Sequence, residues 1–412
     1  MSTNAILRAV VLSAAALCLA LCTVASVRAQ DVGIDPGGSG LFRPKNPETK
    51  KNANKPSTGT KSTSRTAGAT RAKAPNAERV EDLLDKGNQA RDARKFADAE
   101  TAYKEVLQLK PHDARAAYGL GNTYSDQQRW DDAEAAYRDS VAWAPTNADA
   151  HVALSVVLVQ PSLSGDNAKR LADAESFARR SVQIDPKNAF GWDRLGVALQ
   201  ARGILNSETE HSYRRAIELD PQFAAAYAHL ARMLNRSGKQ GEAKPLYEKA
   251  TELAKDPATL NLIADSLQGE QLWPQSEPVL KRALELDANN LTSLLLMGRF
   301  LVVNRRYQEA EPYLKSATEV ASSAFLPFNL LGRAYLGMGR LSDAEATYER
   351  ASTLAASGEK KQLAGIFGFE GVGDGYLKSN QKDKAVRAYQ RALELDPNNN
   401  GAAQKLARAR AN

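Results

Sequence analysis

The phrase Ala-Leu-Glu-Leu-Asp-Pro at residues 392–397 recurs in variant forms along this chain, and its spacing restricts the possible folds more than any other feature. The other copies read VLQLKP (106–111), SVAWAP (140–145), SVQIDP (181–186), AIELDP (216–221) and ALELDA (283–288). The first four copies along the chain end at steps of 34, 41 and 35 residues. The last two copies end at Ala288 and Pro397, which are 109 residues apart, close to three such steps. A period near 34 residues predicts a stacked array of similar units.

Small and large residues alternate at fixed places within each unit. With the last residue of the phrase taken as position 32 of 34, position 8 is small in every unit: Gly87, Gly121, Ser155, Gly196, Ala231, Ala264, Gly298, Gly332 and Gly373. Position 24 is large except at Ala178: Tyr103, Tyr137, Tyr213, Tyr247, Leu280, Leu314, Tyr348 and Tyr389. A small residue lets a second helix approach, and the large residue fills the space beside it. We therefore expect two packed helices in each unit.

The residues between these positions also predict helices. Apolar residues recur three or four apart, which is typical of amphipathic helices. Asp113, Asn147, Asn188 and Asn290 stand at position 34, where the next helix needs an N-cap acceptor. Glycine in the turn 337–340 supplies the left-handed backbone that ends a helix.

This pattern resembles the tetratricopeptide repeat family over residues 80–397. The resemblance implies an all-α fold, a right-handed superhelical solenoid of about nine helix-turn-helix tetratricopeptide repeats. We expect the repeat array at residues 79–397 and a capping helix at 398–412, because the open end of a solenoid needs a polar cover. About seven extra residues near Pro161 and seven near Gly358 belong in loops or lengthened helices.

The N-terminal residues predict export from a bacterial cell. Residues 1–29 contain Arg8, an apolar run at 9–25 and Val27-Arg28-Ala29, as a secretory signal peptide does. Cleavage would give a periplasmic or secreted protein without cysteine, since Cys18 and Cys22 both lie in this segment. The apolar run is just long enough to span a bilayer, so an uncleaved inner-membrane anchor is the alternative.

The basic charge of the chain lies outside the repeats. Of the net charge of +7, the signal segment carries +2, and residues 30–78 carry nine Lys or Arg against four Asp or Glu. The repeats are therefore close to neutral, which argues against nucleic-acid binding. Residues 30–78 are predicted to be a disordered basic linker. The linker is either a solvated tether or a weak contact for an anionic envelope surface.

Catalytic and metal-binding motifs are not apparent in the sequence. The four histidines have no HExxH spacing, and no GxxxxGK phosphate loop occurs. The GxGxG at Gly371, Gly373 and Gly375 has no strand before it, so a hinge or a closely packed neighbour is the better interpretation. We expect a protein that is not an enzyme and that needs no cofactor or metal.

The resemblance to tetratricopeptide repeats also implies a binding surface. In that family, positions 5 and 9 of each first helix line a concave groove that binds peptides. The corresponding residues here are Asn88, Tyr118, Asn122, Asp193, Arg232, Asn261, Asp265, Arg299, Asn329, Arg333, Glu370 and Asp374. Some members grip a C-terminal carboxylate with a lysine at position 5 of the first repeat. Leu84 stands there in this chain, so that clamp is incomplete.

One group of these groove residues has a sharper interpretation. Arg299, Asn329 and Arg333 occupy equivalent positions on neighbouring helices, where two guanidinium groups beside an amide suit an acidic peptide or a carboxylate. The alternative is ordinary pairing between helices, with Asp265 or Glu370 as the partner.

Together these observations predict a non-catalytic protein–protein interaction scaffold of the bacterial cell envelope, which binds a peptide or helix of a partner in its concave groove. The alternative is a regulatory or accessory subunit of an envelope enzyme or of a polysaccharide or protein export complex.

Overall fold

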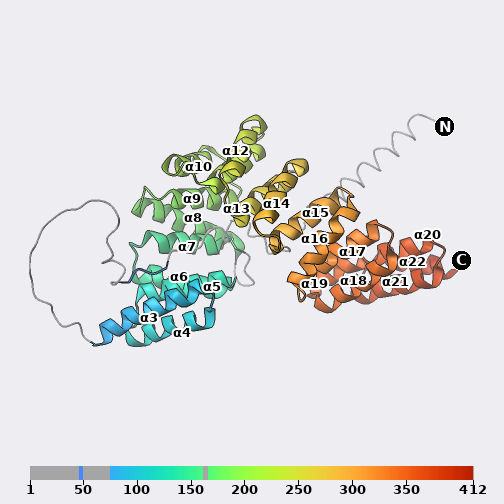
Figure 1. Cartoon of the computed structure of the whole chain (residues 1–412), viewed down its shortest axis with the longest axis horizontal. Helices are drawn as coiled ribbons and strands as arrows, with labels where there is room; N and C mark the ends of the chain where they lie inside the picture. Colours follow the sequence, from blue (N-terminus) through green and yellow to red (C-terminus); the bar gives the residue numbers. More distant parts are fainter. Residues whose placement is uncertain (1–45, 50–74, 161–165, 412) are drawn as a thin grey trace, which may run out of the picture. The chain divides into compact units, whose positions relative to one another are not determined.

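The computed structural model describes residues 46–49, 75–160 and 166–411. The predicted signal segment, most of the predicted linker, residues 161–165 and Asn412 lie outside the described residues. Within the described ranges, helices α3 to α22 make up the regular structure and no strand is present (Figure 1). This confirms the predicted all-α solenoid of paired helices. Among the helices described, none is both long enough and apolar enough to cross a bilayer.

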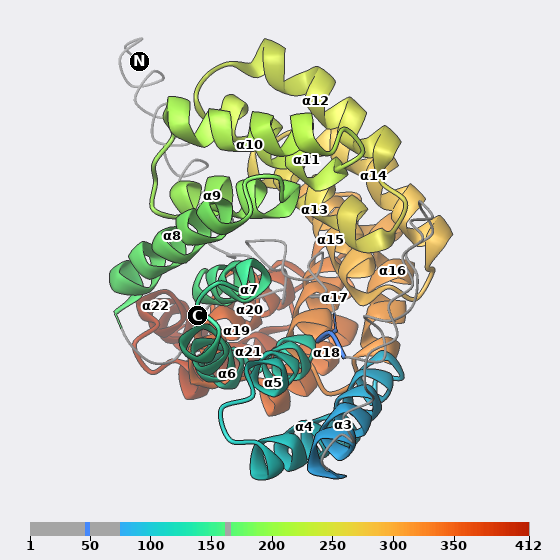
Figure 2. The same ribbon diagram turned by 90° about the vertical axis from the view of Figure 1, so that its left-hand side faces the viewer.

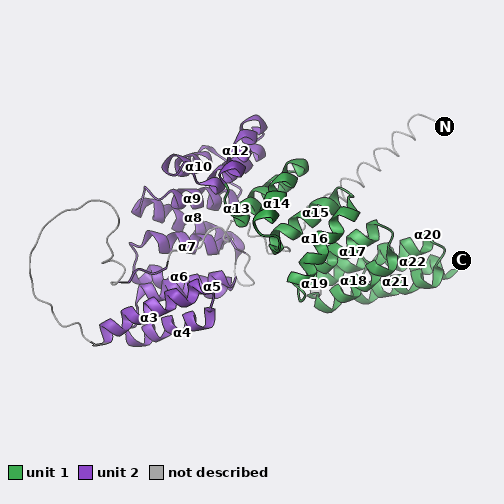
Figure 3. Ribbon diagram, viewed as in Figure 1, with its two compact units in different colours: residues 1–34, 254–412 green, residues 35–253 purple. Residues whose placement is uncertain are grey.

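The chain divides into two compact units, one within residues 35–253 and the other within residues 254–412 (Figure 3). We call the helical part of the first the N-terminal array and that of the second the C-terminal array. The N-terminal array holds repeats 1 to 5, which are α3 (Pro75–Asp92) with α4 (Phe96–Leu109), α5 (Ala114–Asp126) with α6 (Trp130–Trp143), α7 (Ala148–Leu158) with α8 (Asn167–Ile184), α9 (Ala189–Ala201) with α10 (Ser207–Leu219), and α11 (Ala224–Arg236) with α12 (Gln240–Leu253).

The C-terminal array holds repeats 6 to 9, an inserted helix and a final helix. Its helices are α13 (Pro257–Gly269) with α14 (Trp273–Leu286), α15 (Leu291–Val303) with α16 (Tyr307–Val320), α17 (Phe325–Gly337) with α18 (Leu341–Leu354), α19 (Ser357–Ala364), α20 (Phe369–Lys378) with α21 (Lys382–Leu395), and α22 (Asn400–Ala411). The last helix packs against α21 with Ala402, Leu406 and Ala409 buried, as a cap does.

The first helices of successive repeats form a row in each array. In the N-terminal array α3 contacts α5, and α9 contacts both α7 and α11 (Figure 2). In the C-terminal array α15 contacts α13 and α17, and α17 contacts α20. This row carries the predicted groove positions, so side chains from neighbouring repeats can reach one another across it.

The glycine and tyrosine positions pack as predicted. A methyl group on Gly121 would lie 2.5 Å from Cδ1 of Tyr137, and one on Gly373 would lie 2.5 Å from Cε1 of Tyr389. Both tyrosines are buried. A side chain at position 8 would therefore push the second helix of the repeat away. The GxGxG glycines contact their neighbours closely, and this supports the packing interpretation over a hinge.

The predicted helix ends are confirmed as well. The side chains of Asp113, Asn147, Asn188 and Asn290 each accept a hydrogen bond from a backbone N–H in the first turn of the following helix. Gly339 adopts φ of +75°, the left-handed conformation expected in its turn. Local sequence signals thus define both ends of the helices around them.

The two insertions take different forms. The described part of the first lengthens α8, which has 18 residues where α4 and α6 have 14. The second forms the extra helix α19 between repeats 8 and 9. Both outcomes leave the row of first helices in place.

Candidate functional site

The groove asparagines of repeats 1 and 2 are held in one orientation by tyrosines. The hydroxyl of Tyr103 donates a hydrogen bond to Oδ1 of Asn88 at 2.8 Å, and Tyr137 donates to Oδ1 of Asn122 at 2.9 Å. Because each amide oxygen is used in this way, the amide nitrogen of Asn88 is left to face the groove. The tyrosine at position 24 therefore both fills the helix interface and orients a groove donor.

Residues 46–49, with the sequence Asn-Pro-Glu-Thr, lie against this part of the groove. Nδ2 of Asn88 donates to the carbonyl oxygen of Pro47 at 3.0 Å, and Nη1 of Arg115 donates to the carbonyl oxygen of Glu48 at 3.2 Å. Pro47 and Thr49 are buried. The first two repeats thus hold the backbone of this segment through two of its carbonyl groups. These four residues belong to the segment that the sequence predicts to be a disordered linker, and in the structure they contact repeats 1 and 2.

The side chain of Asn46 is bound too. Its Oδ1 accepts a hydrogen bond from Nη1 of Arg91 at 3.0 Å, and its Nδ2 donates to Oδ2 of Asp92 at 2.9 Å. Arg91 is 1% exposed, and its Nε also donates to Asp126 at 2.7 Å. One amide side chain is therefore recognised at both its oxygen and its nitrogen.

Ion pairs fix the arginine that contacts Glu48. Arg115 donates to both carboxylate oxygens of Glu81, at 3.1 and 3.0 Å, and to the carboxylate of Asp113. Burial alone would raise the pKa of Asp113, but hydrogen bonds from Arg115 and Lys110 outweigh it and hold the pKa below its usual value. The donor is thus pre-oriented by charged partners, which lowers the entropy that binding would cost.

Tyr118 lies in the same region of the groove. Its ring centroid is 5.8 Å from that of Tyr137, and its hydroxyl is buried without a hydrogen-bond partner among the described residues. Burial raises the pKa of Tyr118, so the hydroxyl keeps its proton at neutral pH. Its capacity to donate and to accept a hydrogen bond is therefore unused among the described residues.

Asp193, predicted as a groove residue of repeat 4, is completely buried. Nδ1 of His229 donates to its Oδ1 at 2.8 Å, and Nε of Arg194 donates to its Oδ2 at 2.9 Å. Burial alone would raise the pKa of Asp193, but Arg194 and His229 outweigh it and lower the pKa to about 2. Asp193 therefore joins repeats 4 and 5 from inside rather than facing a ligand.

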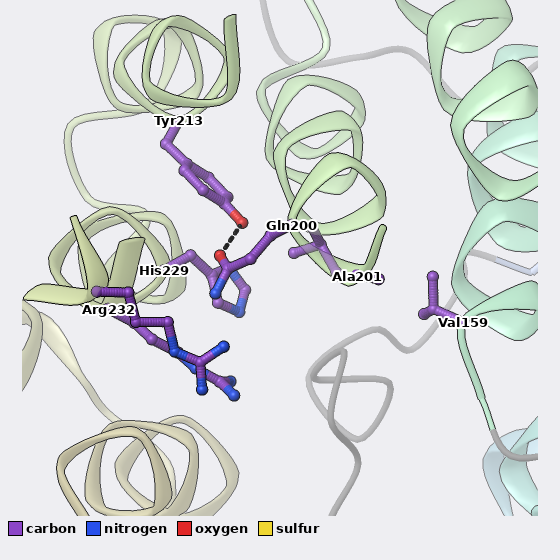
Figure 4. Close-up of a pocket in the computed structure, with 8 residues that line it drawn as sticks. Val159, Gln200, Ala201, Tyr213, His229 and Arg232 are labelled. Carbon is purple, nitrogen blue, oxygen red and sulfur yellow. Dashed lines mark hydrogen bonds between the residues drawn. The ribbon is translucent and has the colours of Figure 1, made fainter. Parts of the chain in front are cut away.

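A cavity of about 130 Å³ opens beside this network (Figure 4). Its lining consists of Val159, Val197, Gln200, Ala201, Tyr213, His229, Arg232 and Arg236. The hydroxyl of Tyr213 donates to Oε1 of Gln200 at 2.9 Å (Figure 4). Nε of Arg232 and Nε2 of His229 are buried without a partner in the described ranges. The sequence predicted Arg232 but missed Gln200 and His229, which the repeat register places at positions 12 and 6.

In the C-terminal array, the first predicted groove residues bind one another. Nη2 of Arg299 donates to Oδ1 of Asp265 at 2.8 Å, and its Nε donates to Oε1 of Gln268 at 3.0 Å. Asn261 donates to Oδ1 of Asn290 and accepts from the hydroxyl of Ser293. This pairing of Arg299 with Asp265 is the alternative that the sequence left open.

The side chains of Arg299, Asn329 and Arg333 do not form one cluster in the structure. Asn329 donates to Oε1 of Gln362 at 3.4 Å. Arg333 stacks its guanidinium 4.8 Å from the ring centroid of Phe367, and burial lowers its pKa. Each member of the predicted cluster thus has a different neighbour, and a clamp of two free guanidinium groups is not supported.

The last two predicted groove residues are covered by the final helix. Nζ of Lys405, on α22, donates to Glu370 at 2.8 Å and to Asp374 at 2.7 Å. The hydroxyl of Tyr389 also donates to Asp374 at 2.7 Å. The lysine of the cap therefore offsets part of the negative charge at this end of the groove.

A metal centre is not seen in the residues the structure describes, because no three His, Cys, Asp or Glu side chains are grouped there to hold an ion. The features that remain for binding are the peptide-like contacts of repeats 1 and 2 and the cavity of repeats 4 and 5.

Comparison with known proteins supports the repeat assignment. Tetratricopeptide repeat families match residues 90–160, 224–257, 328–357 and 368–399. These four stretches are similar to tetratricopeptide repeats. Among solved structures, "Crystal structure of MamA" is 24% identical with a TM-score of 0.35, and the match covers 40% of this chain and 93% of the MamA chain. "MamA 41-end from Desulfovibrio magneticus RS-1" is 18% identical with a TM-score of 0.37, and covers 43% and 95%. No curated protein matches the chain.

Proposed function

We propose that this protein is a non-catalytic scaffold that binds an extended peptide of a partner protein along the first helices of its tetratricopeptide repeats. The observation that carries the proposal is the hydrogen bond from Nδ2 of Asn88 to the carbonyl oxygen of Pro47, with the parallel contact from Arg115 to Glu48. Both donors recognise backbone carbonyl groups, which every peptide offers. The contacts of residues 46–49 therefore support a groove that takes the backbone of a peptide.

The contacts also suggest what such a peptide carries. Arg91 and Asp92 bind the oxygen and the nitrogen of the Asn46 amide, so an asparagine or glutamine side chain fits that place. Pro47 is buried beside it and favours extended backbone at the residue before it. We infer that the partner presents an extended segment with an amide side chain followed by a compact residue.

The cellular setting is part of the proposal. The signal-like residues 1–29 support export to the periplasm or beyond, with an uncleaved inner-membrane anchor as the alternative. The partner would then be a component of an envelope secretion, assembly or polysaccharide-export system.

Quantitative capture from a cell-envelope extract tests the proposal. The full-length protein and the double variant Asn88→Ala with Arg115→Ala serve as baits, with Lys249→Ala as the control because Lys249 is exposed on a second helix and pairs locally with Glu252. We expect one or more partners to be retained by the parent and the control but lost from the double variant. Excess synthetic peptide of residues 43–52 should release the same partners.

Thermal unfolding of each bait establishes that the variants are folded. Recovery of the same partners by all three proteins, or partners that resist the peptide, would show that repeats 1 and 2 are not the binding site.

A further inference from the structure

The groove arginines at position 9 of repeats 5 and 7 occupy equivalent places but have different surroundings. In repeat 7, Arg299 meets Asp265 at 2.8 Å, and Asp265 is position 9 of the preceding repeat. In repeat 5, the equivalent arginine is Arg232, and position 9 of its preceding repeat is Val197. The chain therefore provides a carboxylate for one arginine and a valine for the other.

The side chain of Arg232 is left without the neutralisation that Arg299 receives. Its Nε is buried and has no hydrogen-bond partner among the described residues. A buried cationic donor without a partner is costly, and most such groups in proteins are paired. The nearby carboxylate of Asp193 is already engaged by Arg194 and His229. An acceptor from outside the array would satisfy Arg232.

The glutamine at position 12 also makes different hydrogen bonds beside Arg299 and beside Arg232. In repeat 6, Oε1 of Gln268 accepts from Nε of Arg299 at 3.0 Å. In repeat 4, Oε1 of Gln200 accepts instead from the hydroxyl of Tyr213 at 2.9 Å. The amide nitrogen of Gln200 consequently points away from Tyr213, toward His229 (Figure 4). Gln200 thus offers a donor where Gln268 offers an acceptor.

We propose that the cavity lined by Gln200, His229 and Arg232 is a carboxylate-binding site. The ligand carboxylate takes the place that Asp265 takes beside Arg299, and it accepts hydrogen bonds from Arg232 and from the amide of Gln200. The cavity, at about 130 Å³, has room for a carboxylate and its first carbon atoms but not for a helix. An acidic side chain or the C-terminus of a peptide would supply this group.

The lining of the cavity includes no Asp or Glu among the described residues, so an anion would meet no carboxylate in it. The site stands independently of the peptide contacts at repeats 1 and 2, so each proposal can fail without the other.

Titration of the full-length protein with sodium acetate, exchanged for sodium chloride at constant ionic strength, tests the inference. The observable is the NMR signal of the Arg232 Nε–H group, assigned by its loss in Arg232→Gln. We expect a saturable shift with acetate and none with acetamide. Inorganic phosphate is the second probe, and saturation by phosphate without saturation by acetate would overturn the carboxylate assignment.

Matched variants supply the decisive comparison. Val197→Asp places a carboxylate where Asp265 stands in repeat 6, so acetate affinity should fall roughly tenfold or more. Val197→Asn has nearly the same shape without the charge and should bind acetate much more tightly than Val197→Asp. Conversely, Asp265→Val should create a second saturable site, seen at the Nε–H of Arg299.

Equal acetate affinity in Val197→Asp and Val197→Asn would overturn the inference, since the introduced carboxylate would then not compete for the site. A shift of Arg232 that rises linearly with acetate in the parent would overturn it as well. Thermal unfolding of each variant separates loss of the site from loss of the fold.

Discussion

Replacement of Asp193 by asparagine perturbs the buried charge network that joins repeats 4 and 5. Asp193 is fully buried and accepts hydrogen bonds from His229 on α11 and from Arg194 on its own helix. Asparagine has almost the same shape but no charge, so Arg194, which is 2% exposed, would lose its counter-ion. The amide nitrogen of the introduced asparagine would also face a hydrogen-bond donor, either His229 or Arg194, in both orientations of the amide.

The expected loss of stability is large for a single substitution. Removing one partner of a buried ion pair costs about 3 to 5 kcal/mol, because the other charge stays buried without compensation. The pKa of Asp193, which Arg194 and His229 lower from 3.8 to about 2, agrees with this preference for the charged form. That difference corresponds to about 2 to 3 kcal/mol.

The sign of the pH dependence follows from the same pKa. Because the pKa of Asp193 is lower in the folded protein than in the unfolded chain, its stabilisation is complete above about pH 4 and declines as the pH falls toward 2. The difference between the parent and Asp193→Asn should therefore be largest at pH 7 and shrink below pH 4.

Urea unfolding at pH 7 and at pH 3 measures the loss of stability in Asp193→Asn. Hydrogen exchange of α9 and α11 shows where the loss occurs, because each repeat of an array contacts only its neighbours. Asp132→Asn is the control, since Asp132 is an exposed carboxylate paired with Arg129 and should contribute no more than about 1 kcal/mol. If Asp193→Asn and Asp132→Asn lose the same stability at pH 7, the account of the buried network is wrong.

Three further predictions concern the array itself. Gly332→Leu should lower the free energy of unfolding by about 1 to 3 kcal/mol, because the new side chain overlaps the ring of Tyr348, and thermal unfolding measures the loss. Asn147→Ala removes the cap that binds the N–H of Ala150 and should cost about 1 kcal/mol, seen in urea unfolding and in faster exchange at the start of α7. Lys405→Ala should speed hydrogen exchange in α22 and leave α13 unchanged, since that lysine ties the cap to the groove.

Local features of the structure could be predicted from the sequence. The glycine at position 8 and the tyrosine at position 24 lie 16 residues apart within one repeat, and the structure packs them as expected at Gly121 and Tyr137. The four N-cap residues bind N–H groups only two or three residues away. Such contacts depend on short spacing, which the repeat register supplies.

Residues 46–49 could not be predicted in the same way. They lie between 41 and 67 residues before the side chains that hold them, in a segment without helical periodicity and with almost no large apolar residues. Their polar composition is as typical of a solvated linker as of a bound peptide. Recognition through backbone carbonyl groups leaves little trace in the bound sequence.

The groove arginines show how the remaining information could be extracted from the register. Whether a position-9 arginine is neutralised depends on position 9 of the preceding repeat, some 35 residues earlier. Asp265 precedes Arg299 and pairs with it, whereas Val197 precedes Arg232, and Arg299 itself precedes Arg333. Nε of Arg333 is also buried without a partner among the described residues, but its guanidinium is stacked on Phe367, whereas Arg232 lines a cavity. Comparing successive repeats therefore separates an arginine that stabilises the array from one that is available to a ligand.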